Sequence, residues 1–409
     1  MRYLALLVST LLSLSVLPAV AQDLVPAKRL VLSQDMDLPG GDFASAFDTT
    51  LEACQRACLA NTQCEAFTFN GRNGSCFLKA GPGEGAPYAG AISAYVLPAA
   101  DGAADRAKLR RGEIGFVQDW EMSAITQQAV GLAGDHMTGS WSAPDLMAAA
   151  IDAELSGDFD TASRYVGAAI NLTDAAGDWA EYARLLLAAG EAEGPDQRSY
   201  RERSYFAGVN AYLRAETAPE RHTILVQMGQ ALERLDRGSD TVRALRLAQS
   251  LQSRDDTATY LAEAAAKYGF RIVENRVESD SARPRLCATF SEDLVGKGVD
   301  YASFVQLDEP GLTVSAQYRD ICVEGMTHGQ RATVTFREGL PAADGQVLGA
   351  SVDITSYIRD RNPGVRFPGR AYVLPKAGGA ALPVETVNTE ALDLTLYRVT
   401  DRNLIRAFQ

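Results

Sequence analysis

The spacing of apolar residues divides the chain into a mixed front, a helical middle and a strand-rich rear. Between residues 105 and 269, apolar and small residues recur about every three to four positions, which is the period of an amphipathic helix. From residue 271 onward they alternate with polar residues, as in half-buried strands. The front, residues 28–98, contains both patterns. The sequence therefore predicts a multidomain α+β protein.

The helical middle is expected to form a series of helix pairs. Small residues at Ala150, Ala162 and Ala169 flank the turn Gly157-Asp158-Phe159, and small side chains let two antiparallel helices approach closely. Further helices are predicted at residues 179–189, 200–215, 219–235, 239–251 and 256–268. The pattern resembles tetratricopeptide-type (TPR-like) hairpins, although no period of about 34 residues runs through it. We expect an irregular helical-hairpin array over residues 105–269, joined to the front by an Ala-rich linker at 98–104.

The rear is expected to form an antiparallel β-sandwich over residues 271–376. Short alternating runs separated by Gly and Pro predict strands at residues 271–277, 285–290, 312–318 and 332–336. Cys287 and Cys322 would tie two strands of this sandwich together across a loop of about 35 residues. By the loop-entropy model, a bridge closing a loop of about 35 residues stabilises a fold by roughly 3–4 kcal/mol.

A further domain is expected to start near residue 382. Residues 390–400 alternate apolar and polar side chains, and a second short run follows at 403–409. Roughly three strands are needed for independent stability. The segment 382–409 therefore predicts an incomplete domain, and the chain is expected to be the front part of a longer protein.

The front combines a predicted helix at 49–58 with strands at 29–32, 64–70 and 76–79. Cys54, Cys58, Cys64 and Cys76 fall within it, and spacing alone allows three disulfide connectivities. The pattern C-x3-C-x5-C-x11-C, with Ala-Phe-Thr-Phe-Asn between the last two cysteines, resembles the PAN/apple module. That resemblance implies the pairs Cys54–Cys76 and Cys58–Cys64. Some PAN modules bind proteins or carbohydrate; the alternative is a plain spacer.

The N-terminus has the features of a secretory signal peptide. A positive start at Arg2 precedes an apolar stretch, and Ala19-Val20-Ala21 supplies a small-x-small cleavage pattern after residue 21. The apolar stretch is shorter than the roughly 20 residues of a membrane span. Gln22 is not cysteine, so no lipid anchor is expected. We expect an exported protein, periplasmic or secreted, whose even number of cysteines favours disulfides.

Charge and motif content argue against several functions. The net charge of −13 repels phosphate backbones, so nucleic acid is an unsuitable partner. Of the histidines, His136 and His328 are expected in loops, exposed or capping, and His222 on a helix surface or at a cap. The sequence contains no H-E-x-x-H, G-x-S-x-G or P-loop motif. We therefore expect no catalytic residues, no metal site and no cofactor, and no enzymatic activity.

The rear also carries a family resemblance. Its segments resemble the macroglobulin-type domains of bacterial alpha-2-macroglobulins at residues 283–294, 335–341, 364–368, 372–376, 382–388 and 396–404. The resemblance implies a macroglobulin-type sandwich in the N-terminal region of a periplasmic protease trap, an endopeptidase inhibitor whose partners are proteases. The thioester pattern Cys-x-Glu-Gln is not in the sequence, and no bait segment is recognisable. The alternative is a free-standing envelope adaptor that binds proteins or glycans through the PAN-like module and the helical array.

Overall fold

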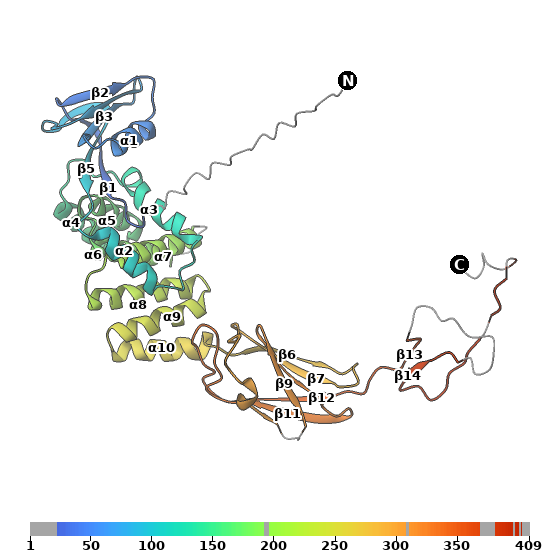
Figure 1. Cartoon of the computed structure of the whole chain (residues 1–409). Helices are drawn as coiled ribbons and strands as arrows, with labels where there is room; N and C mark the ends of the chain where they lie inside the picture. Colours follow the sequence, from blue (N-terminus) through green and yellow to red (C-terminus); the bar gives the residue numbers. More distant parts are fainter. Residues whose placement is uncertain are drawn as a thin grey trace, which may run out of the picture. The chain divides into compact units, whose positions relative to one another are not determined.

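The computed structural model describes residues 23–191, 196–307, 311–368, 381–395, 397–400 and 402 (Figure 1). The chain divides into two compact units, Met1–Lys267 and Tyr268–Gln409. The predicted signal peptide, residues 1–21, lies outside the described residues. Each unit is described by itself below.

The first unit begins with a five-stranded antiparallel sheet and one helix, here called the first module. Its elements are β1 (Lys28–Asp37), β2 (Asp42–Ala46), α1 (Leu51–Ala60), β3 (Ala66–Asn70), β4 (Ser75–Lys79) and β5 (Ala86–Pro98), with the strand order β1-β5-β3-β4-β2. Helix α1 starts at the Thr50 cap, whose hydroxyl accepts the Ala53 N–H at 3.3 Å. Leu32, Phe67 and Leu78 form the core beside α1. The predictions missed β2 and β5.

The rest of the first unit is a run of helices, of which those between residues 143 and 251 each pack on the next. They are α2 (Ala103–Glu113), α3 (Glu121–Asp135), α4 (Ala143–Leu155), α5 (Phe159–Thr173), α6 (Ala176–Ala189), α7 (Gln197–Arg214), α8 (Ala218–Arg234), α9 (Gly238–Leu251) and α10 (Asp255–Tyr268). Ser142 and Thr217 open α4 and α8 with capping boxes. Ala162 and Ala169 are fully buried, which allows α4 and α5 to pack closely. The predicted all-α array is therefore present.

The second unit is a sandwich of two antiparallel sheets, as predicted. Its elements are β6 (Ile272–Glu278), β7 (Arg285–Phe290), η1 (Tyr301–Phe304), β8 (Val305–Leu307), β9 (Thr313–Gln317), β10 (Asp320–Glu324), β11 (Gln330–Phe336) and β12 (Val352–Ile358). One sheet has the order β6-β7-β10-β9 and the other β12-β11-β8. Leu286, Phe290 and Ile321 of the first sheet pack against Phe336 and Ile354 of the second. Strands β8 and β12 were not predicted, and β10 was anticipated only as the strand that carries Cys322.

The chain beyond the sandwich differs from the prediction. A two-stranded sheet pairs β13 (Gly364–Arg366) with β14 (Glu385–Val387). The strand predicted at 390–400 is wrong: residues 390–395 and 397–400 form neither helix nor strand and are exposed. An alternating pattern forms a stable strand only where other strands pair with it and its apolar face is covered, and the described residues supply no partner strand here. The segments 372–376 and 403–409 lie outside the described residues.

Candidate functional site

Two disulfides hold α1 of the first module in place. The Cys54–Cys76 bridge joins α1 to β4, and the Cys58–Cys64 bridge joins α1 to the turn before β3. The two α1 cysteines are four residues apart, so they lie on one face of the helix, toward the sheet. All four are buried. A small module gains much of its stability from such bridges, so these cysteines are structural.

The third disulfide lies within one sheet of the sandwich. Cys287 of β7 and Cys322 of β10 are direct cross-strand neighbours, and the structure joins them with a Cα–Cα distance of 4.0 Å. Both side chains are buried. This bridge links adjacent strands, so it ties the two ends of a loop that contains η1, β8 and β9.

His136 was expected to be exposed or capping; it occupies a helix cap, and its ring is buried. His136 follows α3 as its C-cap residue, and its backbone N–H donates to Leu132 O at 2.9 Å. Its ring Nε2 lies 3.0 Å from the Tyr182 hydroxyl. Burial lowers the pKa of His136 to about 4, and the nearby Arg203 charge contributes. The ring fits because Gly167 leaves it room; a Cβ there would meet the ring at 2.3 Å.

His222 was predicted on a helix surface or at a cap, and this prediction was wrong. His328 was predicted in a loop and lies in a turn. His222 is 1% exposed within α8, and its Nε2 lies 3.1 Å from the Thr257 hydroxyl of α10. Burial and the nearby Arg254 lower its pKa. His328 Nε2 lies 2.8 Å from Ser279 O. Among the described residues, no three His, Cys, Asp or Glu side chains come together as metal ligands.

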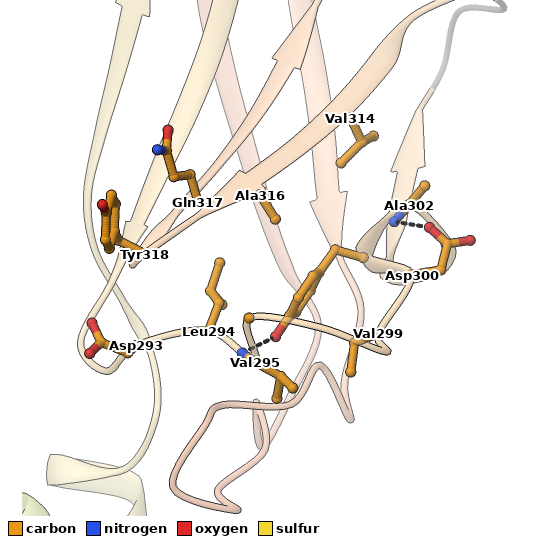
Figure 2. Close-up of a pocket in the computed structure, with 12 residues that line it drawn as sticks. Asp293, Leu294, Val295, Val299, Asp300, Ala302, Val314, Ala316, Gln317 and Tyr318 are labelled. Carbon is orange, nitrogen blue, oxygen red and sulfur yellow. Dashed lines mark hydrogen bonds between the residues drawn. The ribbon is translucent and has the colours of Figure 1, made fainter.

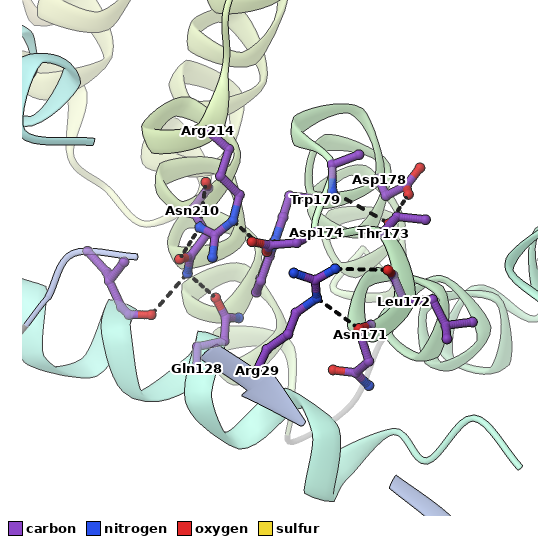
Figure 3. A network of polar contacts seen from close by, with 12 residues as sticks. Arg29, Gln128, Asn171, Leu172, Thr173, Asp174, Asp178, Trp179, Asn210 and Arg214 are labelled. Carbon is purple, nitrogen blue, oxygen red and sulfur yellow. Dashed lines mark hydrogen bonds and ion pairs between the residues drawn. The ribbon is translucent and has the colours of Figure 1, made fainter. Parts of the chain in front are cut away.

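A polar network joins the first module to the helices (Figure 3). Arg29 of β1 donates from Nε to Asn171 O at 3.0 Å and from Nη2 to Leu172 O at 2.9 Å. These carbonyls end α5, where unpaired C=O groups and the helix dipole favour a cation. The main chain adds a further link from Thr138 N to Leu32 O, at 3.0 Å. The first module therefore contacts the helical array directly, and the expected linker at 98–104 does not separate them.

The same network continues through Asp174, the left-handed C-cap residue of α5. Its Oδ1 accepts hydrogen bonds from Trp179 Nε1 at 3.0 Å and from Arg214 Nε at 2.6 Å. The Arg214 guanidinium lies 4.9 Å from the centre of the Trp179 ring. Burial lowers the pKa of Arg214, and Asp174 opposes that effect. Since its charged groups pair with one another, this network has a structural role.

The second unit contains a hollow of about 610 Å³ beside strand β9 (Figure 2). Figure 2 shows Val314 and Ala316 on its β9 side and Val295 and Val299 on the opposite loop, residues 293–302. The buried Tyr301 supports that loop: its hydroxyl accepts Val295 N–H at 2.6 Å and donates to Pro341 O at 2.9 Å. Burial raises the pKa of Tyr301. Sequence reasoning missed this hollow, because its walls come from segments far apart in the chain.

A second hollow, of about 450 Å³, lies among helices of the first unit. Trp120, Tyr205 and Phe206 contribute aromatic walls, and Trp120 is 77% exposed. Arg237 at its side pairs with Glu121 at 2.6 Å and with Asp240 at 2.8 Å. Those charges are therefore already neutralised.

None of the described helices has the length and apolar character that a membrane crossing needs.

Comparisons with known proteins identify the first module. The PAN domain family model matches residues 36–79, which confirms the predicted PAN/apple-like domain. No curated protein matches the chain. Two similar solved structures are native alpha-2-macroglobulin from Escherichia coli spanning domains MG0-NIE-MG1 and a point mutant of Salmonella alpha-2-macroglobulin. Each is 19% identical over 31% of this chain, with a TM-score of 0.24. The chain spans 44% of the first structure and 9% of the second.

Proposed function

We propose that this chain is the N-terminal scaffold region of a periplasmic alpha-2-macroglobulin-like endopeptidase inhibitor, with no catalytic site of its own. The observation that carries the proposal is the macroglobulin-like sequence of residues 283–294 and 335–341. These segments include β7 and the end of β11. Leu286, Phe290 and Phe336 within them are fully buried in the sandwich core. The resemblance therefore falls on the residues that hold the two sheets together.

Export is part of the proposal. Three disulfides are typical of proteins that fold outside the cytoplasm, where thiols are oxidised. The apolar stretch and the Ala19-Val20-Ala21 pattern at the start support a signal peptide cleaved after Ala21. The resemblance to periplasmic protease traps supports the periplasm as the compartment.

The first test is the intact mass of the native exported protein under non-reducing conditions. We expect a single chain several-fold heavier than 43.9 kDa, because trapping needs domains beyond those described here. A mass close to or slightly below 43.9 kDa would exclude a trap that captures its protease covalently through a thioester. In that case the adaptor alternative becomes the better explanation.

The second test measures trapping by the same native protein. A protease enclosed by a trap loses access to large substrates but still cleaves small ones. We expect incubation to protect casein from the protease while hydrolysis of a chromogenic peptide continues. Equal loss of both activities would indicate an active-site inhibitor, and loss of neither would count against inhibition.

The PAN domain favours a second candidate, an envelope adaptor that binds a protein or glycan. Its support is the family match at residues 36–79. The test is pull-down with the native protein from an envelope extract, comparing it with a variant lacking the first module. An adaptor should lose a defined partner in that variant, whereas a spacer should lose none.

A further inference from the structure

Strand β9 forms an edge of its sheet, and although η1 contacts it, its sequence lacks the charges, proline and bulges that usually block further pairing. The sheet order β6-β7-β10-β9 places β6 and β9 at the two edges. Strand β6 carries Glu274, Arg276 and Glu278 and a register shift against β7, and charges and bulges are devices that block edge pairing. Strand β9 reads Thr-Val-Ser-Ala-Gln, with no charge and no proline. Its register with β10 is regular.

The face of β9 that points toward the core is also open. Val314 and Ala316 are opposite Val323 and Ile321 of β10, which are fully buried. Across the ladder, directly opposed residues share one face of the sheet. Yet Ala316 is exposed and Val314 is only partly covered. The hollow of about 610 Å³ lies against these two side chains (Figure 2).

The charged residues that line this hollow are both acidic. Asp293 and Asp300 are exposed at its border, and no Lys or Arg contributes to its described lining. Lys297 belongs to the same loop but does not line the hollow. Tyr318, at the end of β9, is 79% exposed. Tyrosine is enriched among the residues that anchor protein interfaces.

We propose that β9 and its hollow bind an extended, positively charged peptide segment of a partner protein. The segment would add a strand at the β9 edge of the sheet, with main-chain hydrogen bonds supplying affinity. Alternate side chains would enter the hollow over Val314 and Ala316, because side chains alternate along a strand. Lys or Arg near its ends would pair with Asp293 and Asp300.

The charge pattern favours such a partner over a second copy of this chain. Pairing of β9 with β9 of another copy would bring two sets of Asp293 and Asp300 to one interface. The chain also carries a net charge of −13, which adds long-range repulsion between copies. A cationic segment has neither disadvantage.

The test uses the full chain and a fluorescent eight-residue peptide that alternates Thr and Val between terminal lysines. Its twin carries glutamates at both ends. We expect anisotropy titrations to show saturable binding of the lysine peptide and about tenfold weaker binding of the glutamate peptide at low salt. Binding of neither peptide at 100 μM, or equal binding of both, would overturn the proposal.

Two variants locate the binding surface. Ala316→Arg places a cation in the hollow and should weaken binding at least tenfold, because it removes space and repels the lysines. Its matched control is Val273→Arg on the opposite edge strand β6, where Val273 is 52% exposed. Asp293→Asn with Asp300→Asn should weaken binding about three- to tenfold, with Glu338→Gln as control.

Each variant has a defined contrary result. Equal weakening by Ala316→Arg and Val273→Arg would show that the peptide binds elsewhere, and so would no weakening by Ala316→Arg. Far-ultraviolet circular dichroism and the unfolding midpoint establish that the variants fold. Sedimentation of the peptide-free chain as a dimer that Ala316→Arg dissociates would replace the cationic partner with a second copy.

Discussion

Acidification should destabilise the helical region through His136. The ring is buried against Tyr182 and beside Gly167, so its charged form is disfavoured in the folded state. Its pKa falls from an ordinary 6.5 to about 4. At a pH between these two pKa values, the unfolded chain therefore binds a proton at His136 that the folded chain does not. The stabilisation is fully present above pH 6.5 and is lost as the pH falls toward 4.

The size of this effect follows from the pKa difference. One pKa unit corresponds to about 1.36 kcal/mol, so a shift from 6.5 to about 4 amounts to about 3 kcal/mol at most. Other groups also titrate in this pH range, so the contribution of His136 has to be separated from theirs. The control variant for this purpose is His136→Gln. Its amide can still hydrogen-bond Tyr182 but does not titrate.

The assay is urea unfolding followed by tryptophan fluorescence at several pH values between 7.5 and 4. All three tryptophans, Trp120, Trp141 and Trp179, lie in the first unit, so the signal reports on the helical region. We expect the free energy of unfolding to fall more steeply on acidification in the unmodified protein than in His136→Gln. Parallel pH profiles for the two proteins would refute the burial argument.

Three further predictions concern packing, the third disulfide and helix capping. Gly167→Ala should cost about 1–3 kcal/mol in urea unfolding, because its Cβ would lie 2.3 Å from the His136 ring, and an unchanged midpoint would contradict that contact. Replacing both Cys287 and Cys322 by Ser should lower the sandwich stability by roughly 3–4 kcal/mol and leave helical circular dichroism intact; free thiols at these positions in the oxidised native protein would exclude the bridge. Thr217→Ala should lower the free energy of unfolding by about 1 kcal/mol, because it removes the α8 capping box. Thr217→Ser should change it little, and thermal melts of the two variants measure the difference.

The elements predicted correctly have local causes. Helices α6 to α10 begin slightly before their predicted starts, and α8 has its capping box and proline within its first turn. Strand β7 occupies the predicted residues 285–290. Helical period, caps and strand alternation act over a few residues, so they can be recognised without knowing the rest of the fold.

The errors arise where a distant segment decides the outcome. Strand β5 contains several small residues and a glycine, and it becomes a strand because β1 and β3 pair with it on both sides. Residues 390–400 show the reverse case, since a clear strand pattern finds no partner strand among the described residues. His136 follows a helix and looks like a loop residue, yet residues more than 30 positions away bury its ring.

The sequence by itself determined the order of the three regions, most of the helices, the cysteine-rich front and the alternating strands of the sandwich. Those features depend on local periodicity and on covalent spacing. Only the tertiary structure decided which strands lie at the sheet edges, that Arg29 hydrogen-bonds carbonyls in the last turn of α5, and that a hollow opens beside β9. Each of these joins residues far apart in the chain, and the free energy of such contacts depends on burial and register that no local pattern contains.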